Sequence, residues 1–344
     1  MPPSDTAVVI GGRGFIGRHL VPLLLEAGCR VTVVSRRAAP GTGDAPGLAY
    51  RSGDVADAGA MLRVIEGAGV VYDLSLAGGP TWEECRRIYV EGARHVARAC
   101  LAHGVRRLIY TSSIAALYLG GRGVVDERTG PDPRVAGRNS YARAKAEAEN
   151  LLLEMHAREG LPVVVMRPGA VVGRGGALVH GAVGQATADT CLLGWGRGRT
   201  PLPFVLANDV ARAMLAAKDA PAIDGRAFNL VGDVRPSAAE YVRLVAERSL
   251  RNFRFYGRSL PLIAAVDGVK WGAKALLRKP GNQRICYRDL ETLAMPAPFD
   301  CSAAKRLLGW TPVADPETFL RETIDVHLPP VHPGDPRLAP RPLR

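Results

Sequence analysis

Residues 8–17 read Val8-Val9-Ile10-Gly11-Gly12-Arg13-Gly14-Phe15-Ile16-Gly17, an apolar β-branched run followed at once by a glycine-rich turn. Glycine permits a tight turn and lets the backbone approach a pyrophosphate closely, and the N-terminus of the following helix favours the anion. The stretch therefore predicts the first strand, phosphate loop and first helix of a dinucleotide-binding fold, with a ligand-free glycine turn as the alternative. The candidate cofactor contacts here are Gly11, Arg13, Gly14, Phe15, Ile16 and Gly17.

Downstream of this stretch, short β-branched runs alternate with longer amphipathic ones. Such alternation is typical of βαβ units on a parallel sheet. We therefore expect an α/β fold, a Rossmann-type doubly wound parallel sheet with helices on both faces. The predicted strands are 7–10, 31–34, 48–51, 70–74, 107–111 and 162–166, and the predicted helices are 15–27, 58–66, 82–102 and 140–158.

The texture of the chain changes after Pro168, where glycine-rich loops occupy 169–200 and a basic, partly apolar segment spans 250–279. Strand and helix patterns reappear at 204–218 and 226–231. We predict a dinucleotide-binding domain at 1–168 plus about 203–232. A smaller, discontinuous C-terminal substrate-binding region is expected at 169–202 plus 233–328, followed by a flexible, proline-rich tail at 329–344.

The composition, 47% hydrophobic and 23% charged over 344 residues, is that of a globular protein. The chain has no apolar run of about 18 residues and no secretory leader, so we expect a cytoplasmic protein. The six cysteines lack CxxC spacing, which indicates reduced thiols and no metal site. The net charge of +12 is mostly scattered arginine, so no nucleic-acid partner is expected.

The second predicted strand ends in Ser35-Arg36-Arg37, where an NAD-preferring site usually has an acidic residue. Guanidinium groups bind phosphate well, so these residues favour NADP, with NAD as the alternative. Ordinary surface arginines are the other explanation. After the third strand, Asp54 and Val55 are candidate adenine contacts, and Asp57 is the better candidate for capping the next helix.

Tyr141 and Lys145 lie one turn apart on a predicted helix. A neighbouring ammonium favours phenolate and moves the tyrosine pKa toward neutrality, which suits acid–base catalysis. The preceding strand 107–111 leads into Ser112-Ser113, at the sheet edge where ligands bind. Either serine is a candidate for contacting a substrate oxygen. Taken in order, glycine loop, serine pair and YxxxK helix are far more specific than any one of them.

From about Ala7 to His327 the chain resembles the extended short-chain dehydrogenases/reductases, the NAD-dependent epimerase/dehydratase superfamily, and is closer to the dihydroflavonol reductase and 3β-hydroxysteroid dehydrogenase side. The segments that carry the resemblance are Gly11/Gly14/Gly17, Gly53-Asp54-Val55, Leu76-Ala77-Gly78, Thr111-Ser112-Ser113, Tyr141/Lys145, 166–173, 204–213, Phe228-Asn229-Leu230 and 308–312.

The resemblance implies Tyr141 as general acid/base, Ser113 as the residue that polarises the substrate oxygen, and Lys145 as the residue that holds the nicotinamide ribose. It also implies further cofactor contacts and two departures from the family pattern, Ser75 for histidine and Tyr89 for asparagine. With Ser35, Arg36 and Arg37 from the end of the second strand, the candidate cofactor contacts outside the glycine loop are Asp54, Val55, Leu76, Ala77, Gly78, Tyr141, Lys145, Pro168, Gly169 and Val171.

For function, we expect an NADP(H)-dependent oxidoreductase that interconverts a secondary alcohol and a ketone on an apolar or amphiphilic small molecule. A nucleotide-sugar epimerase or reductase is the main alternative, although the arginine such enzymes tend to carry before Phe204 is missing and only Arg197 and Arg199 lie nearby. A non-catalytic NADP-binding regulatory protein is the other class. The resemblance also implies a homodimer built on helices 140–158 and 82–102. For segment 260–279, peripheral membrane contact is an alternative to packing in the substrate-binding region.

Overall fold

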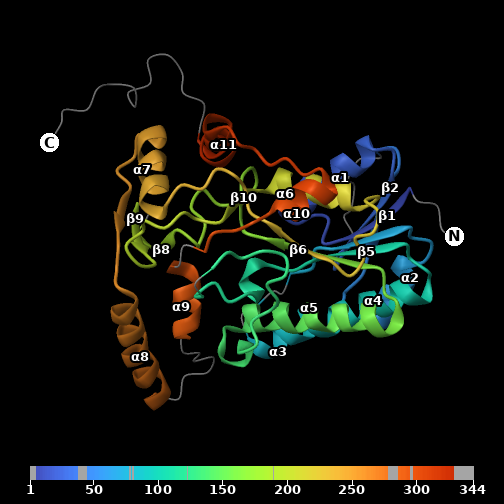
Figure 1. Ribbon diagram of the computed structural model, residues 1–344, viewed down its shortest axis with the longest axis horizontal. Helices are drawn as coiled ribbons and strands as arrows, with labels where there is room; N and C mark the ends of the chain where they lie inside the picture. Colours follow the sequence, from blue (N-terminus) through green and yellow to red (C-terminus); the bar gives the residue numbers. More distant parts are fainter. Residues whose placement is uncertain are drawn as a thin grey trace.

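The computed structural model describes residues 5–37, 45–76, 79, 81–121, 123–188, 190–277, 286–294 and 297–328. Its centre is a seven-stranded sheet in the order β11-β6-β5-β4-β1-β2-β3, in which every pair of neighbours is parallel (Figure 1). This confirms the expected doubly wound fold. The strands are β1 (Thr6–Ile10), β2 (Arg30–Ser35), β3 (Leu48–Ser52), β4 (Val70–Asp73), β5 (Arg107–Thr111), β6 (Val163–Pro168) and β11 (Ala227–Leu230).

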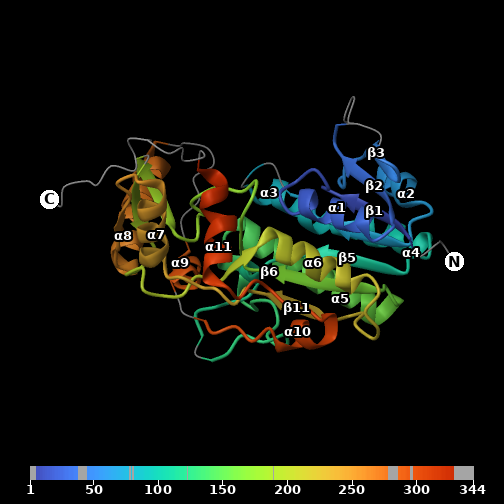
Figure 2. The same ribbon diagram turned by 90° about the horizontal axis from the view of Figure 1, so that it is seen from above.

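Helices cover both faces of the sheet, because alternate side chains of each strand point to opposite faces and both faces are apolar. In β1, Val9 packs into one core cluster, whereas Val8 and Ile10 pack into the other. Figures 1 and 2 show one set of helices on each side. The first set is α1 (Gly17–Glu26), α6 (Ala207–Ala217) and α10 (Ser302–Leu308), and the second is α2 (Ala58–Ile65), α4 (Gly92–Ala102) and α5 (Ser140–Glu159).

The helix expected at 82–102 has an irregular centre. It consists of α3 (Trp82–Cys85), a π-helical segment η1 (Arg86–Glu91) and α4. The π-helical turn carries the buried Tyr89 toward α5. Short π-helical segments are frequent at functional sites, and hydrophobic periodicity does not reveal them.

The C-terminal elements form a second layer of structure at one end of the sheet (Figure 2). Strands occur within 169–200, where the sequence predicts loops: β7 pairs with β10 and β9 with β12, both distant in sequence, and β8 pairs antiparallel with β9. The strands are β7 (Ala170–Val172), β8 (Gly184–Ala188), β9 (Cys191–Gly194), β10 (Phe204–Leu206) and β12 (Arg254–Tyr256). The helices are α7 (Ala238–Ser249), α8 (Leu260–Leu276), α9 (Tyr287–Ala294) and α11 (Pro316–Thr323), with the 3-10 turn η4 (Asp325–His327). Two other 3-10 turns, η2 (Ile114–Ala116) and η3 (Val135–Gly137), lie between β5 and α5.

One late segment returns to the central sheet. Helix α10 packs against α6 and β11, and the Trp310 indole donates a hydrogen bond to the Asp209 carbonyl at 2.8 Å. Residues 301–310 therefore lie on the central sheet, although the sequence groups them with the substrate region. The predicted division into two regions stays a prediction, and the predicted tail at 329–344 lies outside the described residues. In the ranges given above, no helix has both the length and the apolarity needed to cross a membrane.

Candidate active site

A cavity of about 580 Å³ opens at the carboxyl ends of the central strands. Gly11 follows β1, Leu74 follows β4 and Ser112 follows β5, and all three line it. Leu202, from the C-terminal elements, forms part of the opposite wall. Strand order reverses between β1 and β4, and parallel sheets bind ligands at such a reversal. The position of the cavity thus agrees with the expected dinucleotide site.

The glycine loop closes around the end of β1. Gly11 has φ +76° and donates its N–H to the Val34 carbonyl at 2.9 Å. A Cβ on Gly11 would lie 2.7 Å from the Leu74 carbonyl oxygen, and one on Gly17 would lie 2.5 Å from the Gly12 Cα. Helix α1 begins at Gly17 with neither a side-chain cap nor an acidic residue in its first turn. Its positive end is thus open to an anion, which fits a pyrophosphate.

Most of the predicted loop residues face the cavity. Gly11, Gly14, Phe15, Ile16 and Gly17 line it. By contrast, Arg13 is exposed and does not line it.

At the end of β2, Ser35 is followed by the exposed Arg36 and Arg37. Hydrogen bonds join this end to β3: Gly53 donates its N–H to the Ser35 carbonyl at 3.0 Å, and the Ser52 hydroxyl donates to the Arg36 carbonyl at 3.3 Å. Within the described parts of the chain, neither guanidinium makes an ion pair or a hydrogen bond. The structure thus has two unengaged cations where a 2′-phosphate is expected.

The predicted adenine contacts are partly engaged. Asp54 accepts a hydrogen bond from the Ala56 amide at 3.0 Å. Val55 is buried, and its carbonyl oxygen lies 2.8 Å from Nδ1 of His95. Asp57 caps α2, as expected.

Lys145 projects from the first turns of α5 and is only 3% exposed. Its Nζ donates to the Thr111 carbonyl at 2.6 Å. The same ammonium lies 4.2 Å from the ring centroid of Tyr89 and 5.0 Å from that of Tyr110. Burial lowers the pKa of Lys145 to about 8, partly offset by the Asp73 carboxylate. Burial therefore makes the Lys145 ammonium easier to deprotonate.

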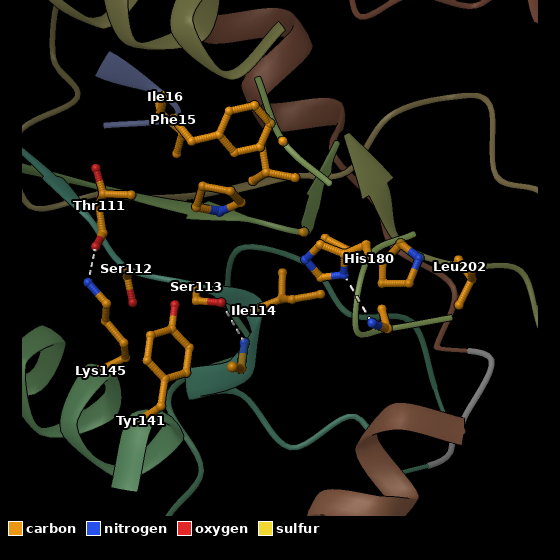
Figure 3. A pocket seen from close by; sticks show the side chains of 18 of the residues that line it. Phe15, Ile16, Thr111, Ser112, Ser113, Ile114, Tyr141, Lys145, His180 and Leu202 are labelled. Carbon is orange, nitrogen blue, oxygen red and sulfur yellow. Dashed lines mark hydrogen bonds between the residues drawn. The ribbon is translucent and has the colours of Figure 1, made fainter. Parts of the chain in front are cut away.

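Tyr141 lies one turn before Lys145, and its hydroxyl points toward Ser113 (Figure 3). Its ring packs edge-to-face on Tyr89, with centroids 5.6 Å apart. Tyr141 is 37% exposed as a residue, but desolvation of its hydroxyl raises the pKa of Tyr141, and a hydrogen bond with Ser113 lowers it by less. The net direction is opposite to the lowering predicted from Lys145, because desolvation dominates and Lys145 donates to Thr111 instead.

The two serines after β5 have different surroundings. The Ser112 hydroxyl donates to the buried Glu149 carboxylate at 2.8 Å, and Glu149 is paired with the buried Arg167. Ser113 instead caps the short turn η2, where its Oγ accepts from the Ala115 amide at 3.1 Å, and it faces Tyr141. Ser112 is thus held in a buried network, and the geometry favours Ser113 for contact with a substrate.

The remaining predicted cofactor contacts also face the cavity. Leu76 is 72% exposed and lines it, as do Pro168, Gly169 and Val171. A Cβ on Gly169 would lie 2.1 Å from the Pro203 carbonyl oxygen, so only glycine fits there. Ala77 and Gly78 lie outside the described residues.

Three residues near the cavity were given no role from the sequence. Tyr89 contacts both Tyr141 and Lys145. His180 lines the cavity, and its Nδ1 accepts from the Ala182 amide at 3.0 Å, while burial lowers its pKa. Arg235 also lines the cavity. No local motif surrounds His180 or Arg235, so only the fold brings them here.

The wall formed by 200–203 is largely apolar. Arg197 and Arg199, the candidates for replacing the arginine that nucleotide-sugar enzymes carry, are exposed and do not line the cavity.

The family described as "NAD dependent epimerase/dehydratase family" matches residues 7–231. Among curated proteins, a 3β-hydroxysteroid-dehydrogenase/decarboxylase of Arabidopsis thaliana (isoform 2) is 27% identical over an alignment that covers 94% of this chain and 63% of that protein. The chain thus spans less than two thirds of that relative. A 3-beta-hydroxysteroid dehydrogenase of Mycolicibacterium neoaurum is 26% identical, with 92% of this chain and 90% of that protein covered.

Among solved structures, the UDP-glucose 4-epimerase of Thermus thermophilus in complex with NAD matches with a TM-score of 0.68 at 20% identity. The match covers 93% of this chain and 98% of that one. At this identity the likeness shows the fold alone. The family match confirms the resemblance predicted from the sequence and agrees with the expected class, an NAD(P)-dependent enzyme.

Proposed function

The chain belongs to the NAD-dependent epimerase/dehydratase family, and from that premise we propose that it is an NADP(H)-dependent oxidoreductase that interconverts a secondary alcohol and a ketone on an apolar or amphiphilic substrate. One observation carries the proposal: Ser113, Tyr141 and Lys145 lie together at the end of an apolar cavity that begins at the glycine loop.

The chemistry follows from three side chains. In reduction, the Tyr141 hydroxyl protonates the developing alkoxide, and its raised pKa keeps it in the acid form at neutral pH. The Ser113 hydroxyl donates a hydrogen bond to the same oxygen. Lys145 would hold a ribose hydroxyl of the cofactor, and its ammonium would stabilise the phenolate that forms when Tyr141 gives up its proton. When bound, the nicotinamide supplies the hydride in reduction and accepts it in oxidation.

An apolar substrate is supported by the cavity wall at 200–203 and by the exclusion of Arg197 and Arg199 from it. The relatives named as 3β-hydroxysteroid dehydrogenases point to the same class, so we propose a sterol-like molecule. A nucleotide-sugar epimerase would need several cations along this wall for the diphosphate, and Arg235 is the one arginine among the described residues that line the cavity. A purely regulatory NADP-binding protein has no need of the grouped serine, tyrosine and lysine.

NADP preference is supported by the unengaged Arg36 and Arg37 at the end of β2. The test is titration with NADPH and NADH, followed by nicotinamide fluorescence. We expect Arg36→Ala/Arg37→Ala to weaken NADPH binding about 10- to 100-fold, the worth of charged hydrogen bonds to one phosphate, with little change for NADH. The matched control is Arg197→Ala/Arg199→Ala, which also removes two exposed arginines. Equal NADPH and NADH affinity in the wild type would contradict the preference.

The expected homodimer and the two-region division stay predictions. Helices α3, α4 and α5 pack beside one another on one face of the sheet, an arrangement that a four-helix dimer interface requires. Light scattering on the purified chain measures the oligomeric state directly.

A further inference from the structure

Arg235 lines the cavity from the segment that joins β11 to α7. The backbone on its C-terminal side is fixed to the cavity wall: Leu202 donates its N–H to the Pro236 carbonyl at 3.0 Å, and Ser237 forms a β-bridge with Pro201. Arg235 is therefore held beside the wall at 200–203 by backbone pairing.

The guanidinium of Arg235 has no hydrogen bond or ion pair with any residue that the structure describes. The acidic side chains nearest in sequence are engaged elsewhere. Asp233 pairs with Lys305 at 2.7 Å, and Glu240 accepts from the Ser237 amide at 2.8 Å as part of the α7 cap. The N–H donors of the Arg235 guanidinium thus have no acceptor among the described residues.

Arg235 is half-buried, and the cavity around it is largely apolar. Leu202, Leu293 and Phe299 line the same cavity. Arginine stays protonated at any physiological pH, and a charge-assisted hydrogen bond is stronger where water is partly excluded. A ligand that brings one negative charge would satisfy the guanidinium.

The arginine and the catalytic residues serve opposite ends of the cavity. Figure 3 shows Leu202 on the far side of the cavity from Tyr141 and Lys145. Because Leu202 is hydrogen-bonded to the residue after Arg235, the backbone at Arg235 lies on the Leu202 side of the cavity. A ligand that touches both ends is long, mostly apolar and charged at one end.

We propose that Arg235 binds a carboxylate of the substrate at the end opposite the reacting alcohol or ketone, so that the substrate class is an elongated apolar hydroxy acid or keto acid. A carboxylate fits one guanidinium because the two form parallel N–H···O bonds. A nucleotide diphosphate is less suited, because Arg235 is the one arginine among the described cavity-lining residues. The inference rests on the proposed function for the reacting end, but its test measures binding and does not need turnover.

The test compares two ketones that differ only in charge, 3-oxo-5β-cholan-24-oic acid and its methyl ester. Their affinities for the NADP-loaded protein are measured by calorimetry, with UDP-glucose as a third probe. We expect the acid to bind about 10- to 100-fold more tightly than the ester, and Arg235→Ala to bring this ratio close to one. Arg235→Lys keeps the positive charge but loses the pair of parallel N–H donors, so an intermediate ratio of affinities is expected. Arg197→Ala is the matched control and should keep the wild-type ratio.

The outcomes separate the inference from the function beneath it. Equal binding of acid and ester by the wild type would overturn the carboxylate site, and Tyr141-dependent reduction of the ester would leave the proposed function standing. Binding of UDP-glucose but of neither ketone would overturn both and assign the cavity to a nucleotide sugar. Binding of none of the three would also overturn both. NADPH affinity and thermal stability of Arg235→Ala confirm that the variant is folded.

Discussion

Helices α5 and α8 have similar lengths, 20 and 17 residues, but very different surroundings. Nine residues of α5 are buried, and they include the charged Lys145 and Glu149. Of the 17 residues of α8, all of them described, only Ile263 is buried. Yet α8 is the more apolar helix. Figure 1 shows α5 along the central sheet and α8 at the edge of the molecule.

The difference shows that available partners, and not apolarity, decided which helix is buried. Alanines on the inner face of α5 allow close packing on the sheet, and each buried charge has a partner, Thr111 for Lys145 and Arg167 for Glu149. Helix α8 instead carries an exposed apolar stripe at helical spacing, formed by Leu262, Val266, Val269 and Leu276. A buried α5 fixes the catalytic side chains, whereas the surface of α8 is left to contact something else.

The largest effect that the comparison predicts is on catalysis at α5. Tyr141→Phe removes one hydroxyl, and we expect kcat to fall about 10²- to 10⁴-fold, because the general acid is lost while the packing of the ring is kept. NADPH titration checks that the cofactor still binds. In the region of α8, the matched change Tyr256→Phe removes an exposed hydroxyl and should leave kcat within about twofold. Comparable losses in both variants would contradict the assignment of Tyr141.

The second effect is on stability. Glu149→Ala leaves the buried Arg167 without its partner and should cost about 3–5 kcal/mol of unfolding free energy. Glu154→Ala on the same helix breaks an exposed i,i+4 pair with Arg158 and should cost only about 0.3–0.5 kcal/mol. Urea denaturation measures both. Equal free energies of unfolding for the two variants would contradict the expected stabilisation by the buried Glu149–Arg167 pair.

A third, smaller effect is pH-dependent. The pKa of Lys145 is about 8 in the folded protein and near the ordinary 10.5 when unfolded. Between these values the unfolded state binds more protons, so this residue makes stability rise with pH from about 8 to 10.5, by at most about 1.4 kcal/mol per pH unit. Below pH 8 both states are protonated and the slope vanishes.

Lys145→Met removes this contribution, while the cysteines and tyrosines that titrate in the same range remain in both proteins. The difference in unfolding free energy between wild type and variant should therefore change between pH 8 and 9.5 and stay constant between pH 6 and 7. A constant difference across the whole range would show that Lys145 is not perturbed.

The smallest expected effect is at α8. Replacing Leu262, Val269 and Leu276 with serine removes exposed apolar surface, so each should change the unfolding free energy by less than about 0.5 kcal/mol. The expected membrane contact gives a separate measurement, co-sedimentation with phosphatidylserine vesicles, which the triple variant should lose. If the wild-type protein does not bind the vesicles, the prediction of membrane contact through 260–279 is wrong. The last two residues of the predicted segment, Arg278 and Lys279, lie outside the described residues.

The nucleotide-binding half was predictable because its signals are local. The run Val8–Gly17 predicts a strand, a turn and a helix start within ten residues. A Cβ on its glycines would lie too close to neighbouring atoms. The spacing of Tyr141 and Lys145 places them on one helix face by geometry alone. The hydrophobic alternation of the strands also predicts a sheet buried on both faces.

Other features depended on contacts between distant residues. The local motif left Ser112 and Ser113 equivalent and only the family resemblance favoured Ser113, whereas in the structure Ser112 is bonded to the buried Glu149–Arg167 pair. Within 169–200, β8 and β9 pair with each other, but β7 pairs with the distant β10 and β9 also pairs with the distant β12.

The sequence by itself thus determined the fold family, the position of the phosphate loop and the residues proposed for catalysis, because these follow from backbone sterics and helical spacing over a few residues. Only the tertiary structure decided the direction of the Tyr141 pKa, the burial of Lys145 and the entry of Arg235 into the cavity. Desolvation and charge pairing depend on which distant segments come together in space, and local sequence patterns do not predict these long-range contacts.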